Sequence, residues 1–138
     1  MGVILVHVDM EGSASVWKWN QTGLSASQLP RSCSYRDAGV SPAEVDRARE
    51  AITREVNAAV EAILAAGRVP VVWDTHGPGC IRPDVLHPDA TVAIGKGGPF
   101  MGHPLLFNDE VEAMFVVGQH CMAGSEGGNL AHTNYHPD

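Results

Sequence analysis

The sequence predicts an α/β fold in which an open, mostly parallel sheet is flanked by helices. Short apolar, β-branched runs alternate with one long segment of helical periodicity, which is the order of elements typical of strands joined by crossovers. The chain has 138 residues and shows neither an internal repeat nor a linker, so we expect a single domain over residues 1–138.

The first strand is expected at Val3–Val8, a short and uninterrupted β-branched run. Residues 13–40 then show no regular period and carry two tryptophans, Trp17 and Trp19. A connection this long inside one domain is usually a functional loop or lid, or else a mobile segment.

A helix is expected from about Pro42 to Ala66. Ser41 is a suitable N-cap, Pro42 fits the first helical position, and Glu44 lies three residues after the cap. Gly67 fits the position that follows a helix C-terminus. Apolar residues recur every three or four positions, as on one face of an amphipathic helix: Val45, Ala48, Ile52, Val56, Ala59, Val60 and Ile63.

Three further strands are expected after the helix, at Val69–Trp73, Ala90–Ile94 and Ala113–Val117. A short helix is expected around 108–112. The glycines at 124, 127 and 128 predict a loop over residues 124–128.

The composition excludes several classes of function. Nine Lys and Arg residues against sixteen Asp and Glu residues give a net charge of −7, which argues against a nucleic-acid or anionic-membrane surface. No apolar run is long enough to span a bilayer, and the first residues do not form a signal peptide. Three cysteines without a CxxC pair favour a reducing, cytoplasmic location.

Side chains that can bind a metal follow three of the four expected strands: Asp9 and Glu11, then Asp74 and His76, then His120. If the strands are parallel, these side chains converge on one crevice at the carboxyl ends of the strands. Carboxylates and imidazoles suit zinc or manganese, and a bridging carboxylate could hold two ions. Taken singly, each has a plainer interpretation as a solvated strand end, a helix cap or a core histidine.

His132 follows the glycine-rich loop, where no apolar pattern would bury it. We therefore consider it a candidate catalytic histidine. His7 lies two residues before Asp9, where it could orient a ligand or simply pack within its strand.

Four motifs resemble those of the zinc-dependent D-aminopeptidases of the DppA type, peptidase family M55. They lie at Val8–Gly12, Asp74–Gly77, Gly118–His120 and Leu130–Thr133. The expected helix also resembles the long helix of that family, in the segments Arg47–Arg49, Thr53–Ala59 and Ala65–Gly67. The resemblance extends over nearly all of the chain, with the motifs in the same order.

The resemblance implies a fold and an activity. Asp9 would bridge two Zn²⁺ ions, with Glu11, His76 and His120 as further ligands, and His132 would be the catalytic histidine. The implied reaction releases an N-terminal amino acid, preferentially a D-amino acid, from short peptides. Relatives in this family form homo-oligomers in the cytoplasm.

In the resembled family a further acidic ligand lies beyond the segment that corresponds to Leu130–Thr133. We therefore expect this chain to be the N-terminal portion of such a protein, with an incomplete second metal site. Two alternatives remain at this stage. The Asp-x-His-Gly string at Asp74–Gly77 also occurs in dinuclear metallophosphoesterases, and a truncated chain could be a non-catalytic scaffold that binds one metal or none.

Overall fold

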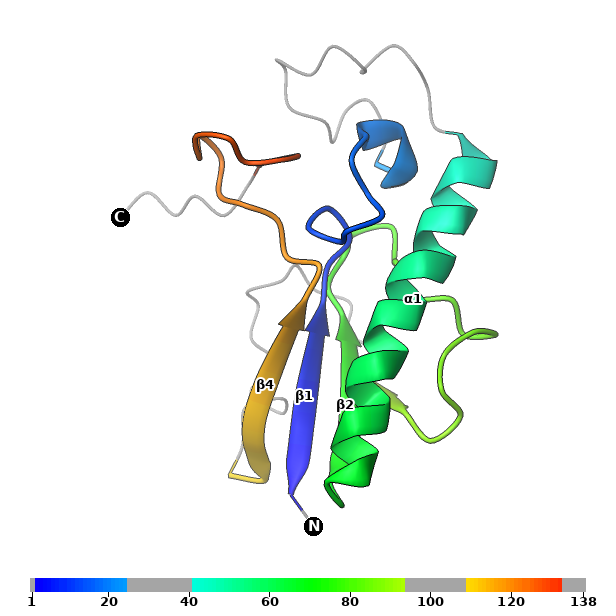
Figure 1. Cartoon of the computed structure of the whole chain (residues 1–138), viewed down its shortest axis with the longest axis vertical. Helices are drawn as coiled ribbons and strands as arrows, with labels where there is room; N and C mark the ends of the chain where they lie inside the picture. Colours follow the sequence, from blue (N-terminus) through cyan, green and yellow to red (C-terminus); the bar gives the residue numbers. More distant parts are fainter. Residues whose placement is uncertain (1, 25–40, 94–108, 133–138) are drawn as a thin grey trace.

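Four parallel strands form one sheet in the computed structural model, which describes residues 2–24, 41–93 and 109–132 (Figure 1). The strand order is β3-β2-β1-β4, and a long helix lies along the sheet. The elements are β1 (Val3–Val8), the 3₁₀ turn η1 (Trp19–Gln21), α1 (Pro42–Ala65), β2 (Val69–Asp74), β3 (Thr91–Ala93) and β4 (Val111–Val117). The predicted α/β class with an open parallel sheet is confirmed.

The register of the sheet brings three strand ends to the same level. Val8 pairs with Asp74 of β2 on one side and with Val117 of β4 on the other. The carboxyl ends of β1, β2 and β4 therefore point the same way, and their loops gather beyond that edge (Figure 1). This is the arrangement on which convergence of the candidate ligands depends.

The core lies between β1 and α1. Ile4, Val6 and Val8 alternate along one face of β1 and pack with the apolar stripe of the helix, which includes Ile52 and Val56. Every residue of β1 after Val3 is buried, as expected of a central strand covered on both faces.

Helix α1 begins and ends at the residues that its sequence signals indicate. Ser41 is the N-cap, where its main-chain carbonyl accepts the first helical N–H groups while its side chain makes no capping bond. Gly67 has φ of 70° and directly follows the C-cap. No helix in the described parts of the chain is long and apolar enough to cross a membrane.

One predicted element is wrong. In place of a short helix over 108–112, residues 109–110 form a turn and β4 begins at Val111 (residue 108 is outside the described ranges). The N–H of Val3 in β1 donates to the carbonyl of Glu110 at 3.0 Å. Pairing with β1 therefore makes β4 begin two residues before the predicted start at Ala113, where local propensity suggested a helix. Of the expected lid over 13–40, the described part contains η1, whereas residues 25–40 lie outside the described ranges.

Two glycines allow the loops after β1 and β4 to touch through their main chains. The N–H of Gly12 donates to the carbonyl of Gly118 at 2.7 Å. A Cβ atom on Gly12 would overlap the carbonyl of Gln119, and one on Gly118 would overlap the carbonyl of Asp9. Because no larger residue fits this contact, the two glycines keep the residues after both strands side by side.

Truncation of a core residue on α1 tests the packing between helix and sheet. Ile52 is 0% exposed, so Ile52→Ala leaves a cavity and should lower the free energy of unfolding by about 2–5 kcal/mol. Urea unfolding monitored by circular dichroism measures this change. Glu61→Ala, an exposed position on the same helix, is the control and should change stability by less than about 0.5 kcal/mol.

Gly118→Ala tests the contact between the two loops. Gly118 and Gly127 both have φ of 70°, so alanine at either position carries a backbone cost of roughly 1–2 kcal/mol. A Cβ atom added at Gly127 would have no neighbour within 4 Å, whereas one at Gly118 would meet the Asp9 carbonyl. Gly118→Ala should therefore lower Tm clearly more than Gly127→Ala. Equal decreases in Tm would show that the close contact at Gly118 does not contribute to stability.

Candidate metal centre

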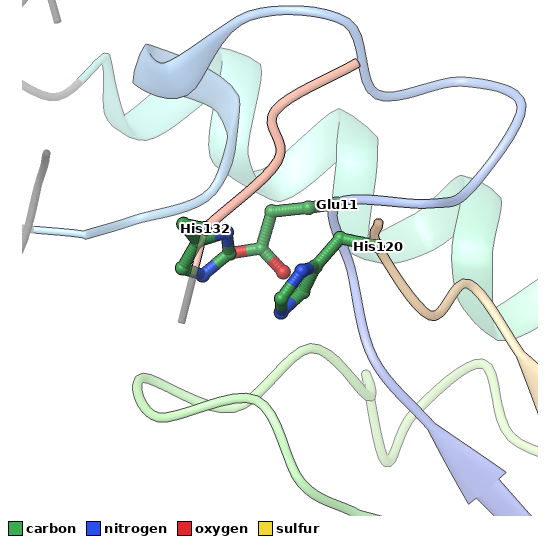
Figure 2. Close-up of side chains that lie close together, drawn as sticks. All are labelled: Glu11, His120 and His132. Carbon is green, nitrogen blue, oxygen red and sulfur yellow. The ribbon is translucent and has the colours of Figure 1, made fainter. Parts of the chain in front are cut away.

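Of the five residues predicted from the strand ends, four come together beyond the sheet and are joined there by His132, whereas Asp74 is not among them. Two overlapping groups have ligand atoms within 4.8 Å of one another, and Glu11 belongs to both. One group is Asp9, Glu11 and His76, and the other is Glu11, His120 and His132. Figure 2 shows the second group, with the Glu11 carboxylate directed toward both rings.

Each of the two carboxylates lies between two imidazoles. Asp9 Oδ1 is 3.4 Å from His76 Nδ1, and Asp9 Oδ2 is 3.4 Å from His120 Nε2. Glu11 Oε2 is 3.3 Å from His76 Nδ1, and Glu11 Oε1 is 3.8 Å from His132 Nε2. The five side chains therefore form one continuous cluster.

All three imidazoles are anchored through their other nitrogen to a main-chain carbonyl. His76 Nε2 donates to Thr22 at 2.6 Å, His120 Nδ1 to Cys121 at 2.8 Å, and His132 Nδ1 to Leu130 at 2.8 Å. Because a carbonyl oxygen only accepts, the proton of each neutral ring must lie on the anchored nitrogen. The lone pair of the second nitrogen is then directed at the carboxylates.

This arrangement requires positive charge between the groups. The Glu11 side chain is 1% exposed, and both of its oxygens lack a hydrogen-bond partner. A buried carboxylate facing imidazole lone pairs is costly unless a cation or a proton lies between them. Carboxylate oxygens and imidazole nitrogens are ligands that zinc prefers, so the residues present fit such an ion.

The pKa values show how strongly the cluster attracts positive charge. Burial alone would lower the pKa of His76, but the carboxylates of Asp9 and Glu11, which lie 3.4 and 3.3 Å from Nδ1, outweigh it and raise the pKa to about 10. Burial likewise opposes ionisation of Asp9, yet bonding to His76 lowers the pKa of this carboxyl to about 2. Without a metal ion, a proton on His76 therefore supplies part of the missing positive charge.

Sequence analysis did not assign Gln119 to the cluster, and it placed Trp19 only in the functional loop expected over residues 13–40. Gln119 Nε2 donates to Asp9 Oδ2 at 3.1 Å, and the only sequence signal for this role is its place directly before His120. Trp19 packs edge-on against the His132 ring, with centroids 5.1 Å apart. The His120 and His132 rings are stacked at 3.8 Å, so His132 is held from two sides.

Two other residues considered from the sequence lie outside both groups. The Asp74 carboxylate accepts hydrogen bonds from the loop that follows β2, including the N–H groups of Cys80 and Ile81. His7 packs edge-on against Trp73, with centroids 5.2 Å apart, and burial lowers its pKa. The interpretation of His7 as a packed strand histidine fits this contact.

The chain matches known proteins at the level of family and fold. The model of the family Peptidase_M55, described as D-aminopeptidase, matches residues 3–137. The structure is similar to that of the Zn-dependent D-aminopeptidase DppA from Bacillus subtilis, a self-compartmentalizing protease, with a TM-score of 0.70 and 22% sequence identity. The match covers 96% of this chain and 43% of the DppA chain, so this chain spans less than half the length of DppA.

No curated protein sequence matches the chain with significance. The family match nevertheless covers nearly the whole sequence, and it includes all five side chains of the cluster. The chain belongs to peptidase family M55, the D-aminopeptidase family.

Proposed function

We propose that this chain carries the zinc centre of an aminopeptidase that releases N-terminal D-amino acids from short peptides. Membership of the D-aminopeptidase family supports the reaction class. The observation that carries the proposal is the buried Glu11 carboxylate, whose two unpaired oxygens face imidazole nitrogens. A proton or a cation must occupy this space, and the ligand types favour zinc.

In this proposal the metal ligands are Asp9, Glu11, His76 and His120. Asp9 has one oxygen toward His76 and the other toward His120, which supports a bridging role between two ions. Bound zinc would supply Lewis-acid polarisation of the peptide carbonyl. The remaining chemistry is assigned to side chains of the chain itself.

His132 is proposed as the catalytic histidine. Its Nδ1–H donates to the Leu130 carbonyl, which leaves Nε2 as a base on the side of the cluster. Nε2 can accept a proton from the attacking water and return it to the amine that leaves. The edge of Trp19 and the stacked His120 ring hold the imidazole in this orientation.

The proposed setting is a cytoplasmic homo-oligomer built from a single α/β domain per chain. DppA is described as self-compartmentalizing, which supports assembly of several copies. The net charge of −7 argues against nucleic acid as a partner, and the three cysteines without a CxxC pair are typical of a reducing compartment.

Metal content and substrate selectivity test the proposal together. We expect about two zinc ions per chain after zinc addition and dialysis, because Asp9 has one oxygen toward His76 and the other toward His120 and could bridge two ions. The loaded protein should hydrolyse D-Ala p-nitroanilide faster than L-Ala p-nitroanilide, and removal of zinc by a chelator should abolish turnover. Elemental analysis and absorbance of released nitroaniline are the measurements.

The same samples separate the alternatives. Hydrolysis of p-nitrophenyl phosphate without action on the anilides would replace the peptidase by a metallophosphoesterase. Zinc binding without any turnover would identify a metal-binding chain that is not an enzyme by itself, and absence of bound zinc would overturn the proposed centre.

His132→Ala distinguishes a catalytic histidine from a metal ligand. If His132 transfers a proton, the variant should lose at least about 100-fold in kcat while its zinc content stays unchanged. His87→Ala, in the loop before β3 and outside both ligand groups, is the matched control and should retain activity. A loss of zinc from His132→Ala would reassign His132 as a ligand, whereas full activity would exclude a catalytic role.

A further inference from the structure

The carboxylate of Asp74, at the end of β2, accepts several hydrogen bonds from the loop that carries His76. Asp74 Oδ2 accepts the N–H groups of Cys80 and Ile81 at 2.7 and 3.0 Å. Asp74 Oδ1 accepts the N–H of His76 at 3.1 Å and the thiol of Cys80 at 3.2 Å. Both oxygens are therefore occupied by donors from residues 76–81, which explains why Asp74 lies outside the ligand groups although it is only two residues from His76.

The same loop is held from the opposite side by the helix. Arg49 of α1 donates from Nε to the carbonyl of Gly79 at 2.9 Å and from Nη2 to the carbonyl of Pro78 at 3.0 Å. Asp74 thus binds N–H groups of the loop while Arg49 binds its carbonyls. A guanidinium with two donors in a fixed plane is well suited to two adjacent carbonyls.

The consequence is a fixed position for the His76 ring. The ring is anchored by Nε2 to Thr22, its side chain is 2% exposed, and Nδ1 faces Asp9 and Glu11. The loop includes Gly77 and Gly79 and contains no helix or strand. Thr75, the first residue of the loop, donates its N–H and its hydroxyl to the Val8 carbonyl at 2.9 and 2.8 Å. Beyond Thr75, the geometry of the loop depends on the Asp74 and Arg49 contacts rather than on a regular backbone ladder.

We propose that Asp74 and Arg49 are positioning residues for His76, acting through the loop 75–81 and not as ligands or catalytic groups. The expected effect on zinc binding rests on the proposed function, whereas the expected effect on the position of the His76 ring does not depend on any metal. Loosening the loop should move Nδ1 away from the two carboxylates, and partners that orient a metal ligand typically contribute about 10–100-fold in metal affinity.

Zinc affinity of two variants tests the inference. Asp74→Asn replaces one acceptor oxygen by an amide that cannot accept from the loop N–H groups, and Arg49→Gln removes the bidentate contact. In competition titrations with a chromophoric chelator, Asp74→Asn should bind zinc about 10–100-fold more weakly than the parent chain, and Arg49→Gln should also bind more weakly. The controls are Asp89→Asn and Arg47→Gln, exposed positions that should bind zinc as the parent does.

A spectroscopic readout separates positioning from a general loss of structure. The Nε2 proton of His76 is buried in its bond to Thr22, so it should give an exchange-protected ring N–H signal in NMR spectra of the zinc-free protein. The signal is assigned by its absence in His76→Gln. The signal should disappear or shift in Asp74→Asn and Arg49→Gln, and it should remain unchanged in both controls. The far-UV circular dichroism spectra of all four variants should stay native.

The outcomes for this inference and for the proposed function are distinct. An unchanged His76 signal in both variants overturns the positioning role, whatever the zinc result. If the parent chain binds no zinc, the proposed function fails, and the NMR signal still decides whether Asp74 and Arg49 position His76. Should Asp74→Asn fail to fold, Arg49→Gln decides the question by the same criteria.

Discussion

The burial of two carboxylates beside three imidazoles is the constraint on which the rest of this structure depends. Asp9 and Glu11 lie two residues apart at the end of the central strand, and neither is accessible enough for water to stabilise its charge. Such a cluster is stable only when protons or a cation lie between its members. Every ring is anchored by one nitrogen and directs the other inward, so the surrounding loops favour a cation at this place.

Two features of the scaffold make this convergence possible. The parallel register places the ends of β1, β2 and β4 at one level. The absence of side chains at Gly12 and Gly118 lets the loops after β1 and β4 approach within main-chain hydrogen-bond distance. Glycine is required at Gly118 for a second reason, since its φ of 70° is costly for other residues. The spacing of the candidate ligands thus depends on main-chain contacts as much as on the ligands themselves.

Helix α1 has two separate roles. Its apolar stripe packs on the sheet, and its flanks order the loops around the candidate metal centre. Glu55 accepts a hydrogen bond from Ser13 at 2.7 Å, just after the carboxylate pair. Asn57 bonds the carbonyl of Val85 and the N–H of His87, on the path from β2 to β3. One helix therefore stabilises the core and also fixes the loops that hold the candidate ligands.

The sequence by itself determined the elements whose signals are local. Apolar periodicity and the Ser41, Pro42 and Gly67 signals give α1 almost to the residue, and β-branched runs give the strands. Position at strand ends also indicated Asp9, Glu11, His76 and His120, because parallel strands bring their carboxyl ends together. Tertiary structure alone decided that β4 begins at Val111, that Asp74 binds the loop while His76 faces the carboxylates, and that Gln119 and Trp19 join the cluster. These outcomes depend on hydrogen-bond and ring partners that are distant in the sequence, and the periodicity of neighbouring residues carries no information about such partners.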